Sequence, residues 1–446
     1  MHTFINFAIK EMLYKYVNYI NYMEEANNNS HQKHEDELII CKNCRKQLEK
    51  VKHITHLSDK DLTVLEDPRR IMNVNYPVRM DNGTVKVINA FRIQYNDALG
   101  PTKGGIRFHP SVNQEEVAEL AFLMSLKTAL VGLPYGGAKG GIRIHAKELS
   151  EGELERVSRG YIKEMAKIIG PHQDIPAPDV NTNPKIMGWM MDEYEHIVGV
   201  KSRAVITGKP ILIGGSLGRN EATARGAFFI IEKKYQKQTN SKIKVAIQGF
   251  GNAGAHLSQM LHNAGFKVVA VSDSSSGIYD SKGLNIPKII EFKEEKNHLV
   301  DYKSGKKISN EELLELKVDI LVPAALGNVI HTNNVKNIKA KVIVEVANAP
   351  ISTSADEILD KNKVEIIPDI LANAGGVIVS YFEWVQNLQN YYWSEDEVNE
   401  KLKLKILKAY KDVLKESKTH NINLRTASYS LSITRILEAE KLRGHI

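Results

Sequence analysis

The 446-residue chain has only two cysteines, Cys41 and Cys44, and this scarcity excludes a scaffold held together by disulfides. No run approaches about eighteen consecutive apolar residues, so the sequence predicts no transmembrane helix. The net charge of +7 comes from 60 basic and 53 acidic residues that are spread along the chain without a basic block. This distribution argues against nucleic acid as a partner. We therefore expect a cytoplasmic protein that binds neither membrane nor nucleic acid.

The CxxC spacing of the two cysteines leaves two alternatives open. With His31 and His34 upstream, they could offer two thiolates and two imidazoles to zinc, although the spacing is not that of a usual zinc finger. Alternatively, they are i and i+3 neighbours on an amphipathic helix from about residue 36 to 53. We favour the helix and predict no metal. Residues 1–35 are predicted to be a disordered extension, of which the first 22 are dispensable.

A chain of this length exceeds the size at which one hydrophobic core keeps growing, so it predicts two domains. In the first, Ser58 caps a short helix, and residues 71–80 and 84–96 flank an Asp-Asn-Gly turn as in a β-hairpin. Helices are expected at residues 114–130 and 151–169. These elements indicate an α/β domain.

The second domain is predicted to begin near Ile211 and to contain a glycine-rich turn, GFGNAG, from Gly249 to Gly254. The GxGxxG pattern by itself matches many sequences by chance. Here it follows an apolar strand at residues 243–248, opens a helix, and precedes a strand that ends in Asp273. That context predicts a dinucleotide-binding βαβ unit with the pyrophosphate at the helix N-terminus. Further strands at 318–323, 341–348 and 364–369 predict a doubly wound parallel sheet.

A second glycine-rich stretch, LPYGGAKGGIRI, surrounds a single lysine, Lys139, with four glycines. Glycines permit close approach of a ligand to the backbone, and a crowded or desolvated lysine loses its proton readily. The segment therefore indicates a catalytic lysine pressed against substrate. The alternative is a surface turn that carries a solvated lysine.

Three further segments carry a family resemblance: Lys103 in GPTKGGIRFHP, Lys127 near the end of an apolar helix, and Asp179 in DIPAPDVNTN. With Lys139 they resemble the glutamate, leucine, phenylalanine and valine dehydrogenases, and most closely the hexameric glutamate dehydrogenases. The resemblance extends from about residue 36 to 443. It implies a substrate-binding and oligomerisation domain (36–210), a Rossmann-type domain (211–380) and a C-terminal helical segment that returns to the hinge (381–446).

The resemblance also implies a reaction. An amino acid lies between the domains and passes a hydride from its α-carbon to the nicotinamide, which leaves an imine that water hydrolyses. Lys139 handles the proton transfers with Asp179 as its carboxylate partner, and we expect Lys103 and Lys127 to favour the neutral form of Lys139.

The other implied site residues form two groups. Substrate would be bound through its α-carboxylate by Lys127 and through its distal carboxylate by Lys103, Ser380 and Arg219, with Asn373 also at the substrate. The implied cofactor-binding residues are Thr223, Gly249, Gly251, Asn252, Ala253, Gly254, Asp273 and Asn348. For each asparagine, a loop side chain that bonds its own backbone remains the alternative.

Asp273 bears on the choice of cofactor, because a carboxylate there accepts both ribose hydroxyls and repels a 2′-phosphate. It favours NAD. The neighbouring donors Ser272, Ser274, Ser275 and Ser276 leave NADP open.

The sequence departs from the family at Ala138, where some relatives have glycine, and at Val346 and Ala349, which replace two glycines of the usual EGANGP. The expected activity is reversible, NAD(P)-dependent deamination of glutamate by a homohexamer, the oligomer being implied by resemblance alone. The rivals are a dehydrogenase of apolar amino acids with the same fold and a catalytically silent, cofactor-binding oligomer.

Overall fold

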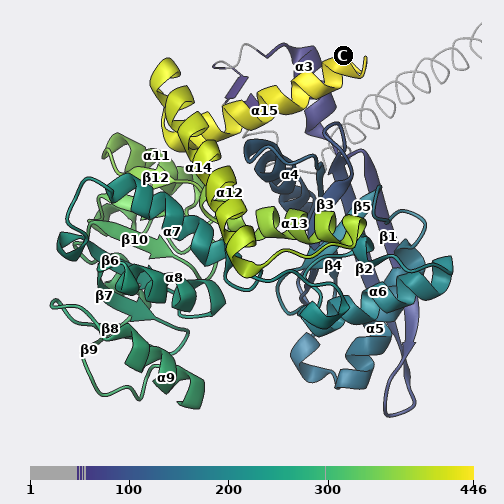
Figure 1. Cartoon of the computed structure of the whole chain (residues 1–446), viewed down its shortest axis with the longest axis horizontal. Coiled ribbons are helices and arrows are strands. Elements are labelled where there is room, and N and C mark those ends of the chain that lie inside the picture. The colour runs from purple at the N-terminus through teal and green to yellow at the C-terminus, as the bar shows by residue number, and fades with distance from the viewer. Residues whose placement is uncertain (1–47, 50, 53, 55–56, 297) are drawn as a thin grey trace, which may run out of the picture.

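The computed structural model describes residues 48–49, 51–52, 54, 57–296 and 298–446, which form two lobes joined by helices from the C-terminal part of the chain (Figure 1). The extension 1–35 and both cysteines of the CxxC motif lie outside the described residues. Among the described helices, none combines the length and apolar character needed to cross a membrane.

The first lobe begins with helix α3 (Asp59–Glu66), whose N-terminus is capped by Ser58 as predicted. Strands β1 (Arg70–Arg79) and β2 (Val85–Asn96) then pair antiparallel in the predicted hairpin. They belong to a five-stranded sheet of order β1-β2-β4-β3-β5, completed by β3 (Thr102–Phe108), β4 (Gly137–Ile142) and β5 (Asp174–Pro178). β3 runs parallel to both β4 and β5, so the carboxyl ends of these three strands lie at one edge of the sheet.

Three helices accompany this sheet: α4 (Gln114–Leu130), α5 (Glu151–Met165) and α6 (Pro184–Val198). The bounds of α4 agree with the sequence prediction. The predicted end of α5 at residue 169 is wrong, because the chain turns after Met165 so that Gly170 can bridge to Asp174. Side-chain periodicity continues through this turn, which is why the pattern overstates the helix.

The glycines beside Lys139 serve packing. β4 is a central strand of the sheet, and a Cβ at Gly136 would lie 1.9 Å from the carbonyl oxygen of Asn96. A Cβ at Gly137 would lie 2.2 Å from Ser125 Oγ, and one at Gly140 would lie 2.7 Å from the Tyr161 hydroxyl. These glycines therefore let β2, α4 and α5 pack closely against the segment that carries Lys139, a role that the sequence did not indicate.

The second lobe is built on a seven-stranded sheet of order β12-β11-β10-β6-β7-β8-β9. Five strands run parallel, as the doubly wound prediction requires: β6 (Lys244–Gln248), β7 (Lys267–Ser272), β10 (Ile320–Pro323), β11 (Val342–Val344) and β12 (Glu365–Ile367). Two short strands, β8 (Gly277–Tyr279) and β9 (Lys306–Ile308), add an antiparallel edge. The helices of this lobe are α7 (Ala222–Tyr235), α8 (Asn252–Asn263), α9 (Ile286–Lys296), α10 (Asn310–Leu314) and α11 (Thr353–Lys361).

The C-terminal part is helical, with α12 (Asp369–Ala372), α13 (Gly375–Gln389), α14 (Glu395–His420) and α15 (Leu424–Leu442). α15 packs against α4 of the first lobe, and the Arg435 guanidinium donates to the carbonyls of Ala129 and Leu130 at the end of α4. α13 runs through residue 380, so the predicted division at 380/381 falls inside one helix.

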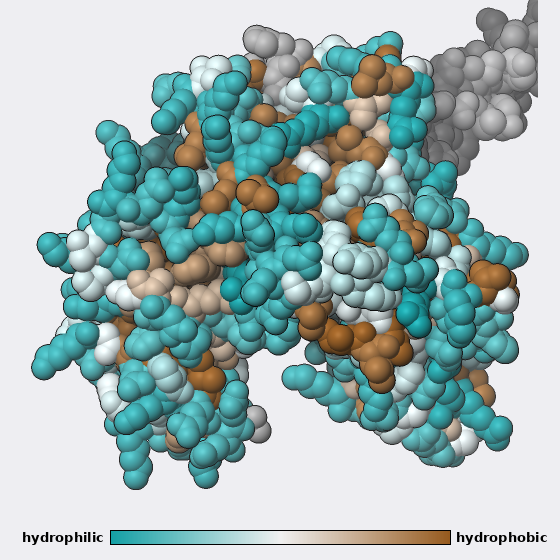
Figure 2. All heavy atoms as spheres, in the orientation of Figure 1, coloured by the Kyte–Doolittle hydropathy of each residue, from teal (hydrophilic) through white to brown (hydrophobic). Residues whose placement is uncertain are grey.

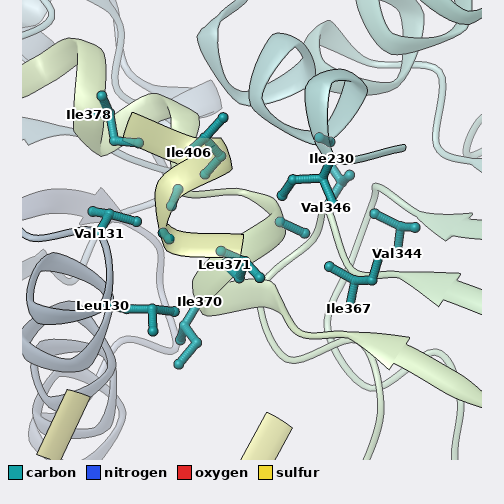
Figure 3. Close-up of a cluster of buried hydrophobic side chains, with 14 of the residues drawn as sticks. Leu130, Val131, Ile230, Val344, Val346, Ile367, Ile370, Leu371, Ile378 and Ile406 are labelled. Atoms are coloured by element: carbon teal, nitrogen blue, oxygen red, sulfur yellow. The ribbon is translucent and has the colours of Figure 1, made fainter. Parts of the chain in front are cut away.

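One hydrophobic cluster joins the lobes (Figure 3). Leu130 and Val131, from the end of α4, face Ile370 and Leu371 of α12, with Ile378 of α13 nearby. All five side chains are buried. The end of α4, which carries Lys127, is thus fixed against the second lobe by apolar burial.

Candidate active site

A cavity of about 210 Å³ lies where the two lobes meet, and Figure 2 shows the surface hollowed between them. It brings together residues from β3, α4, β4, the segment after β5, α7, the loop after β11, and α13. Nine predicted site residues line it: Lys103, Lys127, Lys139, Asp179, Arg219, Thr223, Asn348, Asn373 and Ser380. Positions separated by up to 277 residues of sequence therefore share one site.

Lys139 and Asp179 form an ion pair in this cavity, with Lys139 Nζ 2.6 Å from Asp179 Oδ2. Burial lowers the pKa of Lys139, and Asp179 opposes this shift. Burial raises the pKa of Asp179, but Lys139 and Arg107 outweigh it and hold that carboxyl below its usual range. One member of the pair, Lys139, is therefore disposed to lose its proton. The other member, Asp179, stays ionised.

Arg107 on β3 is a site residue that the sequence reasoning missed. Its Nε donates to Asp179 Oδ1 at 2.8 Å, and its Nη1 lies 2.5 Å from Glu116 Oε1. Arg107 and Arg92 are the cations that lower the pKa of Lys139 most. The sequence had led us to expect this effect from Lys103 and Lys127 instead. The alternation of side chains along a β-strand could have indicated Arg107, because residues 103, 105 and 107 lie on one face of β3.

Lys103 is 1% exposed, and its ammonium donates only to the backbone carbonyls of Ile175 (3.1 Å) and Pro176 (3.3 Å) among the described residues. Burial and the cations Arg92 and Arg219 lower its pKa well below the ordinary value. A buried cation without a carboxylate partner is costly. It is a ready site for an anion.

Ser380 lies on the same cavity as Lys103 and accepts a hydrogen bond from Arg219 Nε at 3.0 Å. Burial lowers the pKa of Arg219, and the nearby Glu383 opposes the shift. Two cations and a hydroxyl therefore line this part of the cavity.

Lys127, Asn348 and Asn373 form a second polar group. Lys127 Nζ lies 3.4 Å from Asn348 Oδ1, which also accepts from Asn373 Nδ2 at 3.0 Å. Lys127 makes no ion pair with the described residues, and burial lowers its pKa to about 8. The Asn373 Oδ1 atom is buried without a hydrogen-bond partner in the described part of the chain. Neither asparagine is a simple turn residue that bonds only its own backbone.

The loop after β11 shows what the two glycine replacements do. Val346 is buried and lies beside Ile230 in the cluster of Figure 3 while also lining the active-site cavity. Ala349 adopts φ = 43°, in the left-handed region that disfavours residues with a Cβ. The loop thus tolerates backbone strain at Ala349 directly after Asn348.

Replacing Ala349 with glycine is expected to stabilise the protein. Removing the Cβ relieves a strain of about 1–2 kcal/mol, partly offset by the added freedom of glycine in the unfolded chain. We expect the thermal unfolding midpoint to rise by about 1–2 °C. Ala347→Gly is the matched control, since Ala347 lies in the same loop with negative φ, and it should lower the midpoint. Equal losses in both variants would contradict the strain.

The GxGxxG turn has the geometry that a dinucleotide requires. Gly249 adopts φ = 99°, and a Cβ there would lie 2.7 Å from Ala325 Cβ. A Cβ at Gly254 would lie 1.8 Å from the Gly249 carbonyl oxygen, so this glycine permits close packing of α8 on the turn. Gly251 faces open space and caps α8 without a side-chain bond. Its backbone can approach a pyrophosphate at the α8 N-terminus, as can Ala253 in the first turn.

Two further predicted cofactor positions, Thr223 and Asn252, lie at the starts of helices. Thr223 is in the first turn of α7, on the active-site cavity, and a Cβ at Gly376 would lie 2.8 Å from its Oγ1. Asn252 opens α8 and donates to the backbone carbonyl of Asn220 at 2.7 Å. Asn252 is not part of the cavity that holds Lys139. It links the glycine turn to the segment before α7.

Asp273 lies at the end of β7 as predicted, but its carboxylate is engaged within its own loop. Oδ1 accepts from the backbone N of Ser275 (2.8 Å) and Ser276 (3.2 Å), and from Ser275 Oγ (2.6 Å). Oδ2 accepts from Lys293 Nζ (2.6 Å) and the backbone N of Leu299 (2.9 Å). The Asp273 carboxylate therefore does not present free acceptors to ribose hydroxyls in this structure.

Two of the four serines around Asp273 are also less available to a 2′-phosphate than the sequence suggested. Ser272 is fully buried and donates to Asn310 Oδ1, and Ser276 Oγ donates to the carbonyl of Gly277. Ser274 and Ser275 are exposed.

Comparison with known proteins agrees with this architecture. Residues 68–196 match the model of the Glu/Leu/Phe/Val dehydrogenase dimerisation domain, and residues 214–444 match that of the glutamate/leucine/phenylalanine/valine dehydrogenases. The chain is 48% identical to the catabolic NAD-specific glutamate dehydrogenase RocG of Bacillus subtilis, over 86% of this chain and 91% of the relative. It is 47% identical to an NADP-specific glutamate dehydrogenase of Synechocystis, over 90% of this chain and 96% of the relative.

Among solved structures, the chain resembles a hetero-hexameric glutamate dehydrogenase of Thermus thermophilus with a TM-score of 0.85 and 34% identity. The match covers 90% of this chain and 95% of that one. Two family models that together span both lobes, with relatives at nearly half identity over most of the chain, show the family. The chain belongs to the glutamate/leucine/phenylalanine/valine dehydrogenases.

Proposed function

We propose that the chain is an NAD(P)-dependent glutamate dehydrogenase, which interconverts L-glutamate and water with 2-oxoglutarate and ammonia. The relatives that carry this name include NAD-specific and NADP-specific enzymes, and the cavity is lined by the residues that the family resemblance implies. The main support for this activity is a pair of buried lysines, Lys103 and Lys127. Both line one cavity, and neither has a carboxylate partner among the described residues.

Lys103 with Arg219 in one polar group, and Lys127 in the other, make no ion pair with the described residues, which favours a substrate that brings one carboxylate to each group. A leucine or phenylalanine side chain would instead need an apolar wall where Lys103 and Ser380 lie. The rival specificity is disfavoured for this reason. The silent-oligomer alternative is disfavoured because the Lys139–Asp179 pair and the glycine turn are both in place.

In the proposed mechanism, Lys127 binds the α-carboxylate, and Lys103 with Ser380 binds the distal carboxylate. When bound, the nicotinamide supplies a hydride acceptor for the substrate α-carbon. The neutral amine of Lys139 takes up the proton of the substrate ammonium and passes it to solvent, which leaves the amine lone pair to form the imine, while the ionised carboxylate of Asp179 stabilises the lysine ammonium. Lys139, whose pKa is lowered by burial, accepts a proton from the water that attacks the imine carbon.

Absorbance assays test the proposed reaction. Purified protein is mixed with ammonia, NADH or NADPH, and either 2-oxoglutarate or 2-oxoisocaproate. We expect rapid cofactor oxidation with 2-oxoglutarate only. Preference for the branched oxo acid would support the rival specificity, and no turnover with any oxo acid would support the silent oligomer.

The pKa of Lys127, lowered to about 8 by burial, gives a pH prediction. Below pH 8 the amine carries the charge that binds the α-carboxylate, and above pH 8 it loses that charge. We expect binding of the unreactive dicarboxylate glutarate to weaken by roughly fivefold between pH 8 and 9. Calorimetric titration of the enzyme–NADH complex measures this.

Lys127→Arg is the control for the pH prediction, because a guanidinium keeps its charge throughout this range. The loss of glutarate affinity should disappear in this variant. The same loss in both proteins would assign the titration to another group.

We further propose that the protein is a homohexamer in the cytoplasm. β1 is an edge strand, and the hairpin that it forms with β2 exposes Val85 (64%) and Val87 (65%). Exposed valines on a hairpin at the edge of a sheet are suited to cover by another chain, which supports assembly through this lobe. A solution mass near six times the 50.1 kDa of one chain would support the hexamer, and a dimer mass would argue against it.

A further inference from the structure

A fully buried ion pair lies between α13 and the segment that connects α6 to α7. Lys209 Nζ is 2.6 Å from Glu383 Oε1, and both side chains are 0% exposed. Glu383 also accepts from the backbone N of Gly208 at 2.9 Å, and the Lys209 ammonium donates to the carbonyl of Ile206 at 2.7 Å. Neither Lys209 nor Glu383 lines the active-site cavity, so the proposed mechanism gives this pair no contact with substrate.

Glu383 nevertheless lies close to the cations of that cavity. It is one helical turn from Ser380 on α13, and Ser380 accepts a hydrogen bond from Arg219. The negative charge of Glu383 opposes the burial that lowers the pKa of Arg219 and of Lys103. Its direct contacts, however, go to Lys209 and to the backbone. Glu383 therefore acts on both cations without forming an ion pair with either.

A second buried carboxylate stands in the same relation to Lys103. The charge of Asp174 also opposes the lowering of the Lys103 pKa, and Asp174 is paired with Arg92, with both side chains completely buried. Each of these two anions thus has a cation of its own. Lys103 and Arg219 are left for a carboxylate that arrives with the ligand.

We propose that Lys209 is a positioning residue that sets the preference for dicarboxylates: by holding Glu383, it keeps that carboxylate from neutralising Lys103 and Arg219. The inference rests on the proposed function and names what keeps its distal-carboxylate site vacant. Without Lys209, Glu383 would turn to the two cations, because a buried carboxylate without a partner is costly. It would then compete with the distal carboxylate of the substrate.

The test measures binding of glutarate and pentanoate to the enzyme–NADH complex by calorimetry. The two acids differ by the distal carboxylate and need no turnover. In Lys209→Met we expect the affinity for glutarate to fall roughly tenfold, because the carboxylate of Glu383 takes the place of the ligand carboxylate. Pentanoate binding should change little. In steady-state kinetics with 2-oxoglutarate, the loss should fall on KM and not on kcat.

The double variant Lys209→Met with Glu383→Gln separates charge from packing. It lacks both charges, so no protein carboxylate competes for the cations, and glutarate affinity should return close to the wild-type value. A structural role predicts the opposite, with both variants losing glutarate and pentanoate binding alike. Lys234→Met is the matched control, since it breaks another 2.6 Å ion pair, with Glu365, outside the cavity and should leave both affinities unchanged.

The variant Lys209→Gln keeps the test decisive if Lys209→Met misfolds, because its amide can donate to Glu383 while the charge is lost. It should lose glutarate affinity in the same way. Unchanged glutarate binding in folded Lys209 variants, or a double variant that does not recover, would overturn the proposal. If the protein turned over no oxo acid, the proposed function would fail, whereas the glutarate comparison would still decide the role of Lys209.

Discussion

Lys139→Ala is expected to lower turnover by roughly 10²- to 10⁴-fold, the range for loss of a group that transfers protons. Folding should be retained, because Asp179 keeps its hydrogen bond from Arg107 when the lysine is removed. The measurement is kcat at saturating 2-oxoglutarate and ammonia. NADH binding, followed by fluorescence, should change little, since the glycine turn lies on the other lobe.

The variant Lys139→Arg distinguishes a role of this residue in proton transfer from a role as a fixed positive charge. A guanidinium can pair with Asp179 but does not give up its proton near neutral pH, so this variant should be almost as inactive as alanine. Substantial activity in Lys139→Arg would mean that the residue acts as a fixed cation. A Lys139→Ala enzyme that kept more than roughly a tenth of its turnover would rule out the assigned role.

The second large effect is expected from Lys103→Leu combined with Ser380→Val. The change replaces a hydroxyl and a lysine that has no carboxylate partner among the described residues with apolar groups. The efficiency ratio of 2-oxoglutarate to 2-oxoisocaproate should fall by roughly 10²- to 10³-fold, because the distal carboxylate would lose a buried charged partner worth a few kcal/mol. Steady-state kinetics with both oxo acids measure the ratio, and the loss should fall mainly on KM.

Stability provides the control for this double variant. Lys103 is a buried ammonium without a counter-ion among the described residues, so leucine should leave the unfolding midpoint unchanged or raise it. A more stable enzyme with weakened carboxylate binding is the signature of a binding residue. A lower midpoint together with an unmoved substrate ratio would assign Lys103 a structural role and reopen the choice of substrate.

Much of the fold is readable from local sequence. The bounds of α4, the capping of α3 by Ser58 and the β1–β2 hairpin follow from periodicity, cap residues and turn residues that act over a few positions. The βαβ unit around GFGNAG was identifiable because strand, glycine turn and helix are contiguous. The end of α5 was not, since the turn after Met165 and the bridge between Gly170 and Asp174 decide it, and the apolar periodicity does not report either.

The candidate site, like the fold, could be predicted only in part from the sequence. Family resemblance identified the positions of Lys103, Lys127, Lys139 and Asp179, and the fold places them on one cavity. Their electrostatic environment was beyond the sequence. The guanidinium that contacts Asp179 belongs to Arg107, 72 residues away, and depends on the pairing of β3 with β5.

The sequence by itself determined which residue types are present and which segments form strands, helices and the glycine turn. Only the tertiary structure decided which charges are paired. Lys103 has no carboxylate partner in the described part of the chain, whereas Asp273 is paired with Lys293. Coulomb interactions and desolvation depend on distance and burial in three dimensions, whereas turn and helix preferences act between near neighbours. The same carboxylate can therefore be a ribose acceptor in one fold and an anchor for a lysine in another.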